Sequence, residues 1–298
     1  MKKRVWRALW RRGIVLSLCA GFWTAALAQP ATDAGLLRDD WGRALPAVPR
    51  PTRIVVLAPH LTESLAVAGL LGQVIAIDAN SDFPAEVADL EHIRAYPPPG
   101  PERLLALRAQ WVMVWAPGIS RSWVERVERT GITVFVSDPR TLGDVAGNIE
   151  RFAAISAQPQ LAHAAALAFH ARLARLEQRF SGRAPVSVFY QVWARPLVSL
   201  GSGDVTADAM RVCGARNVFA GAALAAPQVS EEAVLAARPR LIVAADHPDS
   251  ALRWRRLGAI APAGFAHFAY LEPSAIQRPG PRILDAVEQL CEMVDAAR

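Results

Sequence analysis

The chain has 298 residues, of which 52% are apolar and 20% charged, and this composition excludes an intrinsically disordered protein. The formal net charge of +6 arises from six Lys and Arg residues near the N-terminus. Without these six, 27 basic residues remain against 27 acidic ones, so no basic surface indicates nucleic acid as a partner.

An export signal is predicted over residues 1–28. The basic stretch ends at Arg12, an apolar run follows, and Ala26-Leu27-Ala28 has the small-x-small form of a cleavage site. The apolar run is shorter than the roughly 20 residues of a membrane-spanning helix. Cys19 leaves lipid attachment open, although the Leu before it is not a small residue. We therefore expect a soluble, exported protein, cleaved after Ala28.

Lysine and cysteine usage narrows the chemistry of the mature chain. Both Lys residues lie in the predicted signal, which excludes a P-loop lysine, a Schiff-base cofactor and a Ser–Lys catalytic pair. Cys213 and Cys291 remain after cleavage, and an oxidising compartment favours a disulfide, with two buried free thiols as the alternative. No CxxC motif is present, so no metal site is predicted.

The first half of the chain alternates short apolar runs with helical segments. Residues 29–52 contain four Pro without a hydrophobic period and are interpreted as a tether. Residues 53–157 are assigned to an N-terminal α/β lobe, because such alternation is typical of a parallel sheet covered by helices. The predicted strands are 54–57, 74–77, 111–115 and 133–136, and the predicted helices are 62–68, 101–107 and 120–130.

A long amphipathic helix is predicted at the centre of the chain, from Pro159 to Phe180. Its length is about 33 Å at 1.5 Å per residue, so we interpret 158–182 as a rigid spacer between two lobes. An ordinary core helix of a single domain is the alternative. Apolar residues recur there at steps of three and four, namely Leu161, Ala165, Phe169, Leu173, Leu176 and Phe180.

The second half, 183–298, resumes the α/β pattern and repeats part of the first. Residues 102–114 match 232–244 at an offset of 130 without a gap, with Glu, Leu, Ala and Arg in common. The fold predicted is therefore α/β, with two Rossmann-like lobes joined by one long rigid helix and a ligand cleft between the lobes. The predicted strands are 186–190 and 241–244, and the predicted helices are 205–213, 230–237 and 282–297.

Catalytic motifs are absent from the sequence, whereas aromatic and polar residues follow several predicted strands. The chain has no HExxH, GxSxG or GxGxxG, and we predict no catalytic residue. His60 follows the first strand, where a helix-cap or loop role is favoured over metal ligation. Tyr96, Trp115 and Trp193 would supply stiff apolar walls for a planar ligand, with capping of a core as the alternative for either Trp. Arg278 could bond the ligand's amide or acid groups.

A series of short motifs indicates a known family. They are Arg53–Glu63, Ser81–Pro84, Glu102–Leu107, Val212–Phe219, Pro227–Ser230, Arg278–Ile283 and Gln289–Cys291. Over nearly all of residues 53–295 this order resembles the periplasmic cobalamin-binding proteins of ABC importers. The wider family includes siderophore and haem receptors with the same two lobes and helical backbone.

The resemblance implies roles for individual residues. Glu102 and Glu232 match lobe-tip glutamates that pair with arginines of the membrane permease, and Cys213 and Cys291 match a disulfide pair. Asn80 departs from a cleft tyrosine of the family, and Ser-Ala-Ile-Gln at 274–277 departs from an Asp-Trp-Phe-Glu run. The ligand-binding residues expected are Pro59, His60, Asn80, Tyr96, Trp115, Trp193, Ser274, Gln277 and Arg278.

Three functions are compared on these grounds. The leading one is a monomeric periplasmic receptor that captures a corrinoid, needs no cofactor, and delivers its ligand to an ABC permease and its ATPase. The second keeps the fold and binds haem, with His60 or Tyr96 on the iron, or an iron–siderophore, for which the neutral mature chain supplies no attracting field. The third, an exported enzyme using Asp82, His60 or Glu63 as acid or base, is disfavoured by the missing motifs.

Overall fold

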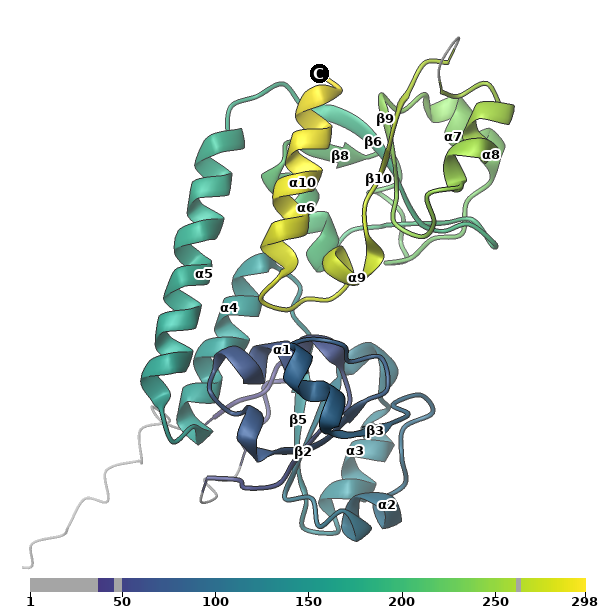
Figure 1. Cartoon of the computed structure of the whole chain (residues 1–298). Coiled ribbons are helices and arrows are strands. Elements are labelled where there is room, and N and C mark those ends of the chain that lie inside the picture. The colour runs from purple at the N-terminus through teal and green to yellow at the C-terminus, as the bar shows by residue number, and fades with distance from the viewer. Residues whose placement is uncertain (1–36, 46–49, 261–263) are drawn as a thin grey trace, which may run out of the picture. The chain divides into compact units, whose positions relative to one another are not determined.

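The computed structural model describes residues 37–45, 50–260 and 264–298 (Figure 1). The predicted signal peptide, with Cys19 and the cleavage site after Ala28, lies outside the described residues. Within the described ranges, no helix combines the length and the apolar character that crossing a membrane would require.

The first lobe is built on a parallel sheet whose described strands follow the order β3-β2-β1-β4-β5. The strands are β1 (Ile54–Val56), β2 (Val74–Asp78), β3 (Glu91–Ile93), β4 (Trp111–Trp115) and β5 (Thr133–Ser137). Both faces of the central strands are buried, which explains why they read as continuous apolar runs. The edge strand β3 was not predicted, because two of its three residues are exposed and polar.

Helices cover both faces of this sheet. They are α1 (Pro59–Val67), α2 (Pro101–Ala106), α3 (Arg121–Glu128) and α4 (Leu142–Arg151), with short 3₁₀ turns at Leu71–Gln73, Ala85–Asp89, Ala116–Gly118 and Phe152–Ile155. Helix α1 begins three residues earlier than predicted, because Pro59 suits a first helical position that needs no N–H donor. Helix α4 was not predicted, although Thr141 and Asp144 form a capping box at its start.

The central helix α5 (Pro159–Phe180) has the predicted bounds, and Figure 1 shows it beside α4 and α10 (Ile283–Ala296). Its N-terminal half differs from the prediction, since Ala162 and Ala166 are buried while Leu161 is half-exposed. Ala162 belongs to the core of the first lobe. The other buried residues of α5 belong to a cluster that α4 shares with the second lobe, namely Ala166, Phe169, Leu173, Leu176 and Phe180. The helix therefore contributes side chains to two core clusters.

The second lobe holds a mixed sheet with described strands in the order β10-β9-β6-β7, and with β8 also paired to β6. All pairs are parallel except β6 with β7. The strands are β6 (Val186–Trp193), β7 (Val198–Ser199), β8 (Ala215–Asn217), β9 (Leu241–Ala244) and β10 (His267–Tyr270). The helices are α6 (Val205–Val212), α7 (Glu231–Ala237), α8 (Ser250–Arg256), α9 (Pro273–Ile276) and α10. The short elements β7, β8, β10, α8 and α9 were not predicted.

The sequence repeat occupies the same place in both lobes. Helix α2 precedes β4 beside β1, and α7 precedes β9 beside β6. Between helix and strand, Arg108 and Arg238 have φ angles of 52° and 44°, and they are the two non-glycine residues with positive φ in the described chain. Because this left-handed conformation is uncommon for a branched or long side chain, its recurrence at the same offset supports a common origin of the lobes.

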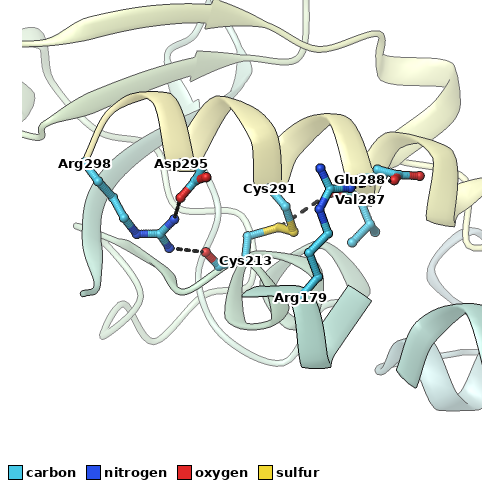
Figure 2. The surroundings of a disulfide bond; sticks show 7 residues. All are labelled: Arg179, Cys213, Val287, Glu288, Cys291, Asp295 and Arg298. Carbon is cyan, nitrogen blue, oxygen red and sulfur yellow. Dashed lines mark hydrogen bonds and ion pairs between the residues drawn. A yellow bond between two sulfur atoms is a disulfide. The ribbon is translucent and has the colours of Figure 1, made fainter. Parts of the chain in front are cut away.

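A disulfide joins Cys213, at the end of α6, to Cys291 in α10, with the sulfurs 2.04 Å apart (Figure 2). This confirms the predicted bond. Arg298 donates to the Cys213 carbonyl oxygen at 2.9 Å, and Arg179 of α5 pairs with Glu288 of α10 at 3.0 Å. Covalent and ionic links thus connect α5, α6 and α10 on the helical side of the second lobe.

Candidate functional site

The first candidate site is a cavity of about 360 Å³ beyond the carboxyl ends of β1, β2 and β4. The connections from β1 and β4 run to opposite sides here, and such a switch point is where open α/β sheets bind ligands. Four of the expected ligand residues line this cavity, namely Pro59, Asn80, Tyr96 and Trp115.

The two aromatic residues in the lining are available to a ligand. The Tyr96 side chain is 78% exposed and Trp115 is 38% exposed, although most large apolar side chains of the described chain are buried. Pro117 and Ile119 extend the apolar lining beside Trp115. An exposed aromatic surface in a concave site suits a broad planar ligand.

His60 lies beneath this cavity and does not face solvent. It is 2% exposed, and its ring packs edge-on against Trp115 with the centroids 5.8 Å apart. Asn148 Nδ2 donates to Ser137 Oγ at 3.1 Å, so the Ser137 hydroxyl is free to donate to His60 Nε2, also at 3.1 Å. Burial lowers the pKa of His60 to about 3, which keeps the imidazole neutral.

The hydrogen bonds behind His60 reach the segment before β1. Asn148 Nδ2 also donates to Asp40 Oδ2 at 3.1 Å, and the same oxygen accepts from the Asp138 N–H at 2.6 Å. Leu45 is buried in the core of the first lobe. Residues 37–45, interpreted from the sequence as part of a tether, therefore pack on the lobe that holds the cavity.

Arginines of the second lobe contact acids of the first beside the cavity. Arg278 Nη1 pairs with Asp82 Oδ1 at 2.5 Å, and its Nη2 donates to the Asn80 carbonyl oxygen at 3.1 Å. The hydrogen bond from Arg278 lowers the pKa of Asp82. In this conformation the arginine expected to bond a ligand is engaged by the first lobe.

A second, deeper ion pair lies behind the first. Arg282 donates to both carboxylate oxygens of Glu63, at 2.7 and 3.1 Å, and Glu63 is 3% exposed. The chain approaches closely here, since a Cβ added at Gly280 would lie 3.2 Å from Glu63 Oε2. A larger residue at 280 would require Glu63 and His60 to shift by a few tenths of an ångström.

A second cavity, of about 200 Å³, lies between the lobes and shares Trp115 and Pro117 with the first. Gln277 is the other expected ligand residue in its lining. Five further polar residues of its lining were not predicted as ligand residues, namely Asp138, Arg140, Tyr190, Asp204 and Thr206. Asp138 and Arg140 follow β5 and could have been found by the strand-end rule used for Asn80, whereas Tyr190 lies inside a strand and carries no local signal.

The remaining expected residues lie outside both linings. Trp193 is exposed at the end of β6 and its indole N–H donates to the Arg195 carbonyl oxygen at 3.1 Å. Ser274 Oγ donates to Glu272 Oε1 at 3.2 Å. Across the described residues, no three His, Cys, Asp or Glu side chains are grouped so that they could hold a metal ion.

The two glutamates expected at the lobe tips occupy equivalent positions. Glu102 and Glu232 are each the second residue of their helix, α2 and α7, and both are exposed. Hydrogen bonds from its own backbone N–H and from Ser230 lower the pKa of Glu232. Each lobe thus presents one solvated carboxylate at the start of the repeated helix.

The chain is similar in sequence to vitamin B12-binding proteins of bacteria. The chain is 32% identical over 248 residues to the vitamin B12-binding protein of Vibrio cholerae, covering 83% of this chain and 90% of that protein. It is 31% identical over 245 residues to the vitamin B12-binding protein of Photorhabdus laumondii, covering 82% and 88%. No family model matches the chain.

Solved structures agree on the fold. The crystal structure of the periplasmic vitamin B12 binding protein BtuF of Vibrio cholerae superposes with a TM-score of 0.77 at 31% identity, over 83% of this chain and 98% of that one. The periplasmic haem-binding protein BhuT, in complex with two haems, has a TM-score of 0.71 at 21% identity, over 82% and 98%. At that identity the second likeness concerns the two-lobed architecture alone.

Proposed function

The chain belongs to the family of periplasmic vitamin B12-binding proteins, and from this premise we propose that it captures a corrinoid between its lobes and delivers it to an ABC importer of the inner membrane. The observation behind the proposal is the aromatic cavity at the β1–β4 switch point, lined by Tyr96 and Trp115. The second cavity shares Trp115 and Pro117 with it, so that a large ligand could contact both lobes.

Capture and delivery make this chain a carrier and not an enzyme. Holding a ligand needs apolar walls, a few hydrogen bonds and release to a partner, and no bond is made or broken. The corrinoid is then cargo and no resident cofactor is required. The partner is an ABC permease with its ATPase, and the receptor acts as a periplasmic monomer after removal of residues 1–28. N-terminal sequencing of protein purified from the periplasm tests cleavage after Ala28.

The nine expected ligand residues fall into three groups in this proposal. Asn80 and Tyr96 contact the ligand from the first lobe, and Trp115 lies where the two cavities meet. From the second lobe Gln277 reaches the ligand directly, while Arg278 would exchange Asp82 for it. The others are Pro59, which lines the cavity, His60, which packs against Trp115, and Trp193 and Ser274, which lie outside both linings and would reach the ligand only if the lobes move.

We also propose the domain limits suggested by the sequence, with lobes at 53–157 and 183–298 and the spacer at 158–182. In support, each lobe range contains one sheet and its covering helices. Limited proteolysis tests these limits, because the first cuts should fall between the lobes and spare both sheets.

A spectroscopic titration tests the proposed ligand. Cyanocobalamin is added to the purified protein, the mixture is desalted, and the corrinoid absorbance that remains is compared with the protein concentration. An equimolar amount supports the proposal, whereas a colourless protein that binds haem under the same conditions would replace the corrinoid by the second candidate.

Matched tryptophan variants make the titration specific to the cavity. We expect Trp115→Ala to lower the affinity for cyanocobalamin at least about tenfold, as loss of a central aromatic anchor does. Trp41→Ala should leave the affinity unchanged, because Trp41 packs between Arg43 and Arg121 away from both cavities. Equal affinities of the Trp115→Ala variant and the unmodified protein would show that the ligand binds elsewhere.

A further inference from the structure

Tyr190 is a buried polar residue in the cavity between the lobes that has no hydrogen-bond partner. Its side chain is 1% exposed, it lines the cavity of about 200 Å³, and its Oη has no partner among the residues that the structure describes. A buried hydroxyl without a partner is unfavourable, so such an atom beside a cavity indicates that a ligand group completes its bonding.

The hydroxyl of Tyr190 is a donor in this setting. Burial, together with the negative charges of Asp204 and Asp246, raises the pKa of Tyr190 and keeps its proton in place. Asp204 shares the cavity lining with Tyr190 and caps helix α6, with its Oδ1 accepting from the Thr206 N–H at 2.7 Å. An acceptor for the Tyr190 proton must therefore come from the ligand, close to a fixed carboxylate.

The charges around the cavity restrict what that ligand group can be. Asp138 also lines the cavity but is paired with Arg140 at 2.7 Å, whereas Asp204 has no ion pair among the described residues. A ligand carboxylate could accept from Tyr190 but would face the Asp204 charge, and an apolar group would leave the hydroxyl unsatisfied. A primary carboxamide satisfies both residues, because its carbonyl oxygen accepts and its NH₂ group donates.

We propose that the interlobe cavity is a subsite for a primary carboxamide of the ligand, with the Tyr190 hydroxyl donating to the carbonyl oxygen and the Asp204 carboxylate accepting from the NH₂ group. The inference rests on the proposed function, since a corrin ring carries primary amides on its periphery whereas haem carries carboxylates. The subsite therefore gives the receptor a means of preferring a corrinoid over a haem.

Calorimetry with a pair of tyrosine variants tests the donor. Tyr190→Phe should lower the affinity for cyanocobalamin about threefold to tenfold, the usual value of one hydrogen bond. Its melting temperature without ligand should equal or exceed that of the unmodified protein, because the substitution removes an unsatisfied hydroxyl. Tyr270→Phe is the control, since the Tyr270 hydroxyl bonds Glu272 outside both cavity linings and its loss should not change the affinity.

A second ligand series tests the selectivity. Cyanocobalamin is compared with its monocarboxylic acids, in each of which one peripheral amide is hydrolysed. The unmodified protein should bind at least one acid about tenfold more weakly than the amide. Asp204→Asn keeps a good helix cap and should recover much of that loss.

The outcomes separate the subsite from the proposed function. If the unmodified protein binds cyanocobalamin and Tyr190→Phe binds it equally well, the donor assignment is wrong while the function stands. If every acid binds as well as the amide, or Asp204→Asn recovers nothing, the carboxamide subsite is wrong. If the unmodified protein does not bind cyanocobalamin at all, both the function and the subsite fail.

Discussion

Two buried titratable residues of α1 decide much of the chemistry under the cavity. His60 is neutral because burial lowers its pKa to about 3, and Glu63 forms an ion pair with Arg282. They lie three residues apart on one helix and have different roles. His60 supports Trp115 from below, and Glu63 holds the second lobe.

The neutral His60 makes stability depend on pH. Its pKa is lower in the folded state than the usual 6.5, so between about pH 6.5 and pH 3 the unfolded chain binds a proton that the folded chain does not. The free energy of unfolding should therefore decrease by up to about 1.4 kcal/mol per pH unit as the pH falls through this window. Urea unfolding at about pH 7 and about pH 5 measures this decrease in the free energy of unfolding.

Histidine variants identify the group responsible. His60→Gln should remove most of this pH dependence, whereas His247→Gln should retain it, because His247 is exposed. If both variants kept the same slope as the unmodified protein, the titrating group would have to be sought elsewhere.

The Glu63–Arg282 pair should be worth more than a surface ion pair. Glu63→Gln leaves Arg282 with a weaker partner, and we expect a loss of about 1–3 kcal/mol in the free energy of unfolding. This lies below the value for fully buried pairs because Arg282 retains access to water. Glu177→Gln is the matched control, since its pair with Arg211 is exposed on both sides and should cost less than about 1 kcal/mol. Equal losses for the two variants would contradict a structural role of the interlobe pair.

At the scale of elements, the disulfide covalently links α10 to the end of α6 in the second lobe. Cys213 and Cys291 are 78 residues apart in sequence, so the bond restricts a long loop of the unfolded chain. Replacing both with Ala should lower the free energy of unfolding by about 4 kcal/mol. Denaturation with and without a thiol reductant checks this, because the reductant should destabilise the unmodified protein and leave the double variant unchanged. If the reductant left the denaturation midpoint of the unmodified protein unchanged, the disulfide would not stabilise the fold as proposed.

The central helix shows how an element depends on its neighbours. Its bounds follow from local sequence, because residues 160–180 contain no Gly or Pro and apolar residues recur at helical spacing. The identity of the buried face in its first two turns does not follow from local sequence. Ala162 and Ala166 are buried there in place of Leu161 and Ala165, since α4 and α1 pack against this half and a small residue lets the helices approach.

At the scale of the whole molecule, we propose that the start of the repeated helix in each lobe contacts the transporter permease. Glu102 and Glu232 occupy the second position of α2 and of α7, one in each lobe. Reversing both charges with Glu102→Arg and Glu232→Arg should abolish stimulation of the transporter ATPase in proteoliposomes. The affinity for ligand should stay the same, because neither residue lines a cavity.

A second double reversal controls for net charge. Glu150→Arg with Glu177→Arg alters the charge by the same amount at two exposed positions on α4 and α5, and should leave the stimulation intact. Loss of ligand affinity together with stimulation in the Glu102/Glu232 variant would show that the tip assignment is wrong.

Most regular elements could be predicted because their signals are local. Strands such as β4 and β9 are apolar runs of four or five residues. The sequence repeat at an offset of 130 residues predicted two similar lobes. Helix α4 was missed because Gly143 and Gly147 weaken its helical pattern, while packing against α5 compensates for them. Short edge strands such as β10 pair mainly with one neighbour and leave little pattern in the sequence.

Local sequence was enough for the α/β class, the bounds of the long helix and the residues at the ends of the first sheet's strands, because periodicity and turn residues act over a few positions. The pairing of Glu63 with Arg282, 219 residues apart, came only from the tertiary structure. The tertiary structure alone also showed that Trp115, Tyr190 and Asp204 line one cavity. These contacts depend on how two separately folded sheets face each other, and no periodicity within either lobe encodes that.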